Sequence, residues 1–93
     1  MPKLTIAKFR ELIRSLSYVV SLHAAEELDD DNLTILDLES IILTGEIVER
    51  QRDAQSREVK FLIRGFTLEG GTAEAAVKLG PTGRLVVITV YVA

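Results

Sequence analysis

The sequence has no cysteine, no tryptophan and only one histidine among its 93 residues. Without thiols the chain cannot form a disulfide, attack a substrate through sulfur, or hold zinc or an iron–sulfur cluster through thiolates. A single imidazole also argues against an ordinary zinc site. Metal chemistry here would depend on carboxylates and hard cations, and we expect neither a resident metal nor a cofactor.

Long apolar runs are missing as well. No stretch approaches the roughly 20 consecutive apolar residues of a membrane-spanning helix, and the first residues lack the basic-then-apolar layout of a signal peptide. We therefore expect a cytoplasmic protein that does not contact a membrane. With 47% hydrophobic residues, a chain of this length is expected to form a single domain, 1–93, around one core. Its oligomeric state is left open.

The net charge of −3 hides an uneven distribution along the chain. Residues 1–49 carry four lysines and arginines against ten aspartates and glutamates, whereas residues 50–93 carry seven against four. Because the acidic part is predicted to be helical and the basic part to form a sheet, we expect opposite surfaces to differ in charge. This is a mild indication of an anionic ligand.

Apolar residues at helical spacing predict three helices in the first half of the chain. These helices span residues 5–16, the segment from Ser21 or Leu22 to Leu28, and residues 34–45, with a short β-rich run at Tyr18–Val20 after the first. Thr34 and Asp37 have the spacing of a capping box, which predicts the start of the third helix. Gly45 lies where a glycine commonly ends one.

After Gly45 the apolar period changes from near 3.6 to 2, which predicts strands. The predicted strands are 46–53, 58–64, 72–79 and 85–92, with turns at 70–71 and 80–83. The last strand is almost wholly apolar and β-branched, as is typical of a central strand buried on both faces. The sequence therefore predicts an α+β fold, with N-terminal helices on one face of a four-stranded antiparallel meander. Tyr18–Val20 could pair at an edge of it.

Strand alternation separates the residues of the predicted sheet into an apolar face, which should carry the helices, and a polar face. The apolar face is expected to include Val86, Ile88, Val90 and Val92. The polar face is expected to carry Lys60, Arg64, Glu74, Lys78, Thr89 and Tyr91. Three cations, a carboxylate and a phenol are the parts needed for metal-independent phosphodiester cleavage. The alternative is an ordinary solvent face on which Glu74 forms a salt-bridge network with Lys60 and Lys78.

His23 is the single histidine, and it lies where the short apolar run turns into the acidic second helix. Imidazole is the side chain best suited to moving protons near neutral pH, so His23 is the natural candidate for that role. A purely structural histidine beside a helix N-terminus is the alternative. The acidic run that ends this helix has no calcium-loop spacing, which favours a solvated helix end over a metal site.

Several short motifs occur together in one order along the chain. They are His23-Ala24, Leu28, Gly45-Glu46-Ile47-Val48-Glu49, the segment 60–65, and Val87-Ile88-Thr89-Val90-Tyr91. In this order the chain resembles, over residues 18–92, a bacterial family of domains of unknown function allied to the RelE, BrnT and MqsR toxins. The helix at residues 5–16 lies outside the resemblance.

The resemblance implies a RelE/barnase-like α+β domain, and a type II toxin that cleaves messenger RNA and is silenced by an antitoxin. The implied partner is a zinc-finger antitoxin of the MqsA type. His23 matches the family histidine, and with Glu74 it would transfer protons while Tyr91 orients the substrate or acts as an acid. The residues implied to hold phosphate are Arg57, Lys60, Arg64, Lys78 and Tyr91.

The chain departs from the family pattern at three places. Many members have His-Ala-x-x-Arg-Met-x-x-Arg, whereas this sequence has Glu27 and Asp31 at the two arginine positions. Glu74 stands where relatives often have histidine. Two hypotheses therefore stand side by side: a toxin-like ribonuclease, and a catalytically inactive protein-binding module of the same fold. In the second, the cationic sheet face would dock an acidic segment of a partner.

Overall fold

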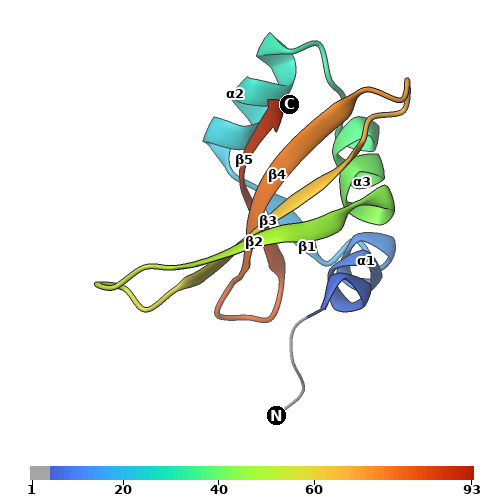
Figure 1. Cartoon of the computed structure of the whole chain (residues 1–93). Coiled ribbons are helices and arrows are strands. Elements are labelled where there is room, and N and C mark those ends of the chain that lie inside the picture. Colours follow the sequence, from blue (N-terminus) through green and yellow to red (C-terminus); the bar gives the residue numbers. More distant parts are fainter. Residues whose placement is uncertain (1–4) are drawn as a thin grey trace.

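The computed structural model describes residues 5–93 and contains one sheet and three helices. The elements are α1 Ile6–Arg14, β1 Tyr18–Val20, α2 Leu22–Asp30, α3 Ile35–Thr44, β2 Glu46–Arg52, β3 Val59–Phe66, β4 Thr72–Leu79 and β5 Leu85–Val92. Figure 1 shows α1 and α3 on one side of the sheet and α2 beside β5. The predicted α+β class and the three helices are thus confirmed.

The sheet has the strand order β1-β5-β4-β3-β2. Strands β2 to β5 form the antiparallel meander that the sequence predicts. The edge pairing that Tyr18–Val20 could make is confirmed, but the prediction of four antiparallel strands is corrected to a mixed sheet of five, because β1 runs parallel to β5, with Tyr18 opposite Leu85. β5 is therefore hydrogen-bonded on both sides along its first half, which accounts for its apolar, β-branched sequence.

A β-bulge in β5 changes which residues face the helices. Ala76 of β4 pairs with Thr89, but the next residue, Val77, pairs with Val87, so Ile88 has no partner across the ladder. The extra residue reverses the alternation of side chains. Leu85, Val86 and Val87 therefore lie on the opposite faces from those predicted, and Leu85 and Val87 are fully buried. The placement of Thr89 and Tyr91 on the face away from α1 and α3 is unaffected, because both follow the bulge.

The core lies between the sheet and the pair α1 and α3. Its largest fully buried side chains are Phe9, Ile13, Leu38, Ile41, Ile42, Ile63, Leu85, Val77, Val87 and Val90. The rings of Phe9 and Phe61 meet edge to face at 5.1 Å between centroids, a preferred aromatic geometry. α2 follows directly after β1 and packs against β5. It buries Ala24 and Leu28 there.

Two glycines let α3 and β3 approach closely. A Cβ atom on Gly65 would lie 1.9 Å from the carbonyl oxygen of Ile41, and one on Gly45 would lie 2.4 Å from the same atom. Gly45 ends α3 as predicted, but its φ of −89° is open to any residue. Glycine is therefore required at position 45 because a larger side chain would not fit, and not because the backbone is left-handed. The consequence is that the backbone of α3 lies directly on the backbone of β3.

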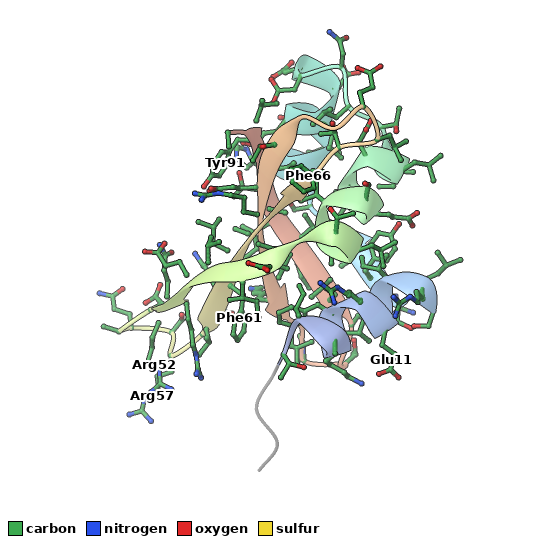
Figure 2. All side chains as sticks on the ribbon, turned by 45° about the vertical axis from the view of Figure 1, so that its right-hand side comes forward. Glu11, Arg52, Arg57, Phe61, Phe66 and Tyr91 are labelled. Carbon is green, nitrogen blue, oxygen red and sulfur yellow. The ribbon has the colours of Figure 1, made fainter. Side chains whose placement is uncertain are left out.

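The hairpin of β2 and β3 extends away from the rest of the molecule. Figure 1 shows it as a long arm, and Figure 2 places Arg52 and Arg57 near its end. Arg57 adopts a positive φ of 61° in the connecting turn. Closer to the body, the guanidinium of Arg50 lies 5.7 Å from the ring centroid of Phe61, within cation–π range.

Asp37 joins the start of α3 to the loop between β3 and β4. The capping box predicted for Thr34 and Asp37 is confirmed, since each side chain bonds the backbone N–H of the other residue. The second carboxylate oxygen of Asp37 accepts a hydrogen bond of 2.9 Å from the N–H of Leu68. The backbone N–H groups of Thr34 and Leu68 hold the pKa of this carboxyl below its ordinary value.

We expect Asp37→Asn to lower the free energy of unfolding by about 2 kcal/mol at pH 7, because it weakens a helix cap and a charge-assisted bond. Since the pKa is lower in the folded state, this contribution is complete above about pH 4, the ordinary value, and disappears as the pH falls through the folded value. Urea unfolding from pH 7 to pH 3 measures it. A gap between wild type and variant that stays constant down to pH 3 would contradict this assignment.

No helix within residues 5–93 is both long and apolar enough to cross a bilayer.

Candidate functional site

A buried carboxylate occupies the sheet face that points away from α1 and α3. Glu74 of β4 is 5% exposed and lies across from Arg64 of β3 on one side and Tyr91 of β5 on the other. Its Oε2 accepts a 2.7 Å hydrogen bond from Nε of Arg64, and its Oε1 accepts one of 2.5 Å from the Tyr91 hydroxyl. We call Arg64, Glu74 and Tyr91 the sheet triad.

The sheet triad keeps Glu74 charged. The hydrogen bond from Tyr91, reinforced by the bond and the positive charge of Arg64, lowers the pKa of Glu74. The same hydrogen bond, with burial and the negative charge of Glu74, raises the pKa of Tyr91. A carboxylate that is ionised and already bonded on both sides is a poor proton acceptor. The geometry of Glu74 suits it instead to holding Arg64 and Tyr91 in place. The Arg64 side chain is about half exposed, and Tyr91 is about two-fifths exposed.

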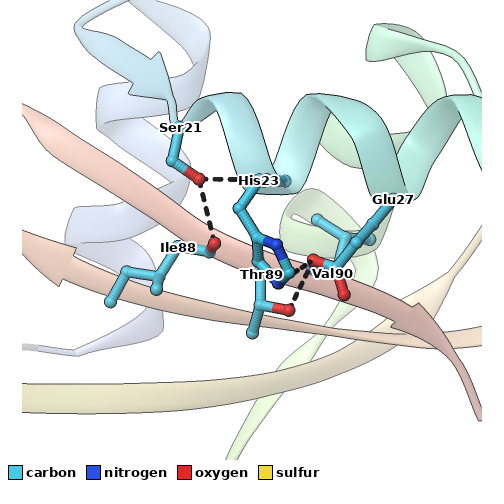
Figure 3. Close-up of polar contacts among 7 residues, drawn as sticks. Ser21, His23, Glu27, Ile88, Thr89 and Val90 are labelled. Atoms are coloured by element: carbon cyan, nitrogen blue, oxygen red, sulfur yellow. Dashed lines mark hydrogen bonds and ion pairs between the residues drawn. The ribbon is translucent and has the colours of Figure 1, made fainter.

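A second cluster forms where α2 meets β5, as Figure 3 shows. Nε2 of His23 lies 3.4 Å from Oε1 of Glu27, one helical turn further along α2. The same oxygen accepts hydrogen bonds of 2.5 Å from the hydroxyl of Thr89 and 2.9 Å from the N–H of Val90. We call His23, Glu27 and Thr89 the helix–strand cluster. The His23 side chain is 68% exposed, so it is not sealed in the core.

Ser21 fixes the direction in which α2 starts. Its hydroxyl accepts a hydrogen bond from the N–H of Ala24, as an N-cap does, and donates one of 2.9 Å to the carbonyl of Ile88. The carbonyl of Ile88 belongs to the bulged residue of β5. The first turn of α2, which carries His23, is thereby tied to the middle of β5.

The two clusters lie on the same face of the sheet. Thr89 and Tyr91 are two positions apart on β5, after the bulge, so their side chains point to one side with Cα atoms about 7 Å apart. Within residues 5–93 no hydrogen bond or ion pair joins His23 to Glu74 or to Tyr91. The clusters are therefore neighbours along β5 that share one solvent-facing surface.

The other predicted phosphate-binding residues are not gathered at this point. Arg57 lies in the turn of the hairpin arm, before the start of β3 and seven residues from Arg64. Lys78 pairs with Glu58 at 3.0 Å instead of with Glu74. Lys60 is four residues from Arg64 on β3, about 13 Å away. The salt-bridge network predicted between Glu74 and the two lysines does not form, because residues four apart on a strand share a face but do not touch.

Glu27 is the residue whose importance the sequence did not reveal. It occupies an arginine position of the resembled pattern, but in the structure it is the partner of His23 and of β5. The spacing of His23 and Glu27 is i, i+4 on a helix, which by itself predicts that the two side chains meet. The contact of Glu27 with Thr89 has no such local signal. In the described part of the chain, no three His, Asp or Glu side chains converge where a metal ion could bind.

Comparison with known proteins identifies a family but no function. No curated protein and no solved structure is significantly similar to this chain. The model of one protein family, described as a domain of unknown function (DUF4258), matches residues 20–92. None of these findings links the chain to the RelE, BrnT or MqsR toxins. Because the match covers most of the sequence, the chain belongs to the DUF4258 family of domains of unknown function.

Proposed function

We propose that this protein is a toxin-like endoribonuclease that cleaves RNA without a metal, through the sheet triad and the helix–strand cluster. The observation that carries the proposal is their common face: an exposed histidine beside a carboxylate at β5, and on the same face an arginine of β3 fixed by a buried glutamate. The resemblance to RelE-type toxins supports the same reaction, and the RelE/barnase-like assignment of the fold is part of the proposal.

Each residue has a distinct task in this reaction. His23 takes the proton from the ribose 2′-hydroxyl as its oxygen attacks phosphorus, and Glu27 stabilises the imidazolium that results. Arg64 donates hydrogen bonds to the non-bridging oxygens, where negative charge builds up. Tyr91 orients the phosphate, and Glu74 acts as a positioning residue. The bond from phosphorus to the 5′-oxygen breaks, water protonates that oxygen, and a 2′,3′-cyclic phosphate forms.

Cleavage of a labelled single-stranded RNA by the purified protein in EDTA tests the proposal. Products with cyclic phosphate and 5′-hydroxyl ends are expected, and His23→Ala should lower the rate about 10²-fold, the usual contribution of one general base. Since His23 is exposed, the variant should unfold at the wild-type temperature. Leu22→Ala, which removes a 77% exposed neighbour on α2, is the matched control and should keep full activity.

Growth of bacteria that express the chain gives an independent test. Expression should arrest growth, and co-expression of the neighbouring open reading frame, the expected zinc-finger antitoxin, should restore it. Absence of RNA cleavage together with unaffected growth would reject the ribonuclease.

A protein-binding module without catalysis is the second candidate, and charge pairing favours it. Arg64 is bonded to Glu74 and Lys78 to Glu58, so two of the three sheet cations are already neutralised. RNA binding depends on unpaired cations near phosphate. If the wild-type protein neither cleaves RNA nor slows growth, docking of a partner segment on the sheet face becomes the better interpretation.

A further inference from the structure

α3 is apolar on two sides, although residues 5–93 cover only one of them. Leu38, Ile41 and Ile42 are completely buried against the sheet and α1. On the outer side, Leu36 is 58% exposed and Leu43 is half-buried. A surface helix ordinarily carries one apolar stripe, and a second stripe marks a side that another layer can cover. The outer layer is absent from the described chain.

The end of β3 and the loop that follows it are bonded to side chains of α3. Ser40 donates a 2.7 Å hydrogen bond to the carbonyl of Phe66, and the N–H of Phe66 donates one of 2.9 Å to the hydroxyl of Thr44. Asp37 holds the N–H of Leu68 in the same way. Three bonds at successive turns of α3 therefore fix the backbone of Phe66 and Leu68 beside the helix, so the position of Leu68 is pre-organised.

Two hollows run along this junction and share Leu68. Their volumes are about 340 and 290 Å³. We call this continuous surface the α3 groove. Its exposed apolar side chains are Leu36 and Leu68, which are 58% and 62% exposed, beside the half-buried Leu43. The Phe66 side chain points, like that of Arg64, to the sheet face away from α3.

The rim of the α3 groove is acidic. Asp37, Glu39 and Glu69 line it, and Glu69 forms no ion pair with any residue of the described chain. No lysine or arginine is among the described residues that line the two hollows. A ligand of this groove thus meets apolar side chains flanked by uncompensated negative charge.

We propose that the α3 groove binds an amphipathic helix of a partner protein, with leucine-like anchors at i, i+4 and i+7 and lysines or arginines on either side. α3 is about 15 Å long, which matches two to three turns of a helix packed alongside it. Helix-in-groove binding of this kind uses such anchors. A second copy of the chain would oppose one acidic rim to another, and an anionic lipid surface would be repelled in the same way.

The probe that tests this is a fluorescein-labelled helical peptide of 18 residues, with leucines at i, i+4 and i+7 and lysines on the flanks. Its matched control replaces every lysine by glutamate. Fluorescence anisotropy should show at least tenfold tighter binding of the basic peptide, and NMR shifts should fall on α3 and residues 66–69. Leu36→Ser and Leu68→Ser should each raise Kd at least tenfold. Leu22→Ser, which changes a still more exposed leucine on α2, should leave Kd unchanged.

Equal affinity for the two peptides, shifts confined to the sheet face, or wild-type affinity in both leucine variants would each overturn the proposal. So would a dimer in light scattering that Leu36→Ser converts to a monomer, because a second copy would then be the occupant. The proposal does not depend on RNA cleavage: Leu36 and Leu68 lie outside both clusters, so their variants should cleave RNA as the wild type does.

Discussion

Arg64→Ala should lower the rate of RNA cleavage about 10³-fold, since removal of one well-placed donor to the transition state costs 10²–10³. The effect is expected to be large because Glu74 fixes the guanidinium through two nitrogen atoms. Among the described cations, no other contacts the sheet triad. Initial rates on a labelled RNA, measured well below the unfolding temperature, give the result.

Arg64→Lys and Arg84→Ala complete this experiment. Lysine keeps the positive charge but lacks the planar guanidinium that donates two hydrogen bonds. Arg64→Lys should therefore retain only part of the wild-type activity. Arg84 is exposed in the turn before β5, away from both clusters, and its loss should leave the rate unchanged. If Arg64→Ala and Arg84→Ala cleave equally well, the sheet triad is not the reaction centre, even if the protein is a ribonuclease.

Gly65→Ala should lower the free energy of unfolding by about 3 kcal/mol or more, at the upper end of overpacking effects. The added methyl group would meet the backbone of Ile41 at 1.9 Å, and backbone cannot rotate away as a side chain can. α3 must then separate from β3. For a chain of this size, about 3 kcal/mol corresponds to a fall of about 12–24 °C in the unfolding temperature, which calorimetry measures.

Gly71→Ala is the matched control. A methyl group at Gly71 would meet only the side chain of Thr67, at 3.3 Å, in an exposed loop. Its effect should stay within about 1 kcal/mol, as for other exposed substitutions. Equal losses of stability in both variants would show that the close contact of α3 and β3 is not what requires glycine at position 65.

Local patterns predicted the elements well and the connections between them less well. The capping box of Thr34 and Asp37 and the strand over 72–79 were both found at the predicted positions. Their signals lie within a few residues of sequence. Three residues at 18–20 carry no information about which strand they pair with, so the parallel contact with β5 could not be derived.

In the candidate site too, local patterns were predicted and tertiary contacts were not. Alternation placed Arg64, Glu74 and Tyr91 on one face, because no bulge intervenes between the paired residues. The bulge at Ile88 was not foreseen, since an extra residue leaves no mark in a strand that is apolar on both faces. Pairing of Lys78 with Glu58, and of Glu27 with Thr89, depends on tertiary contacts over 20 and 62 positions.

The parallel contact of β1 with β5 sets an order of events during protein synthesis. Residues 18–20 find their partner only after residues 85–87 have left the ribosome, because 67 positions separate Tyr18 from Leu85. His23 follows the first of these segments and Tyr91 follows the second. A nascent chain that has not yet emerged beyond Tyr91 therefore lacks the assembled face, and the proposed cleavage should not begin before that point.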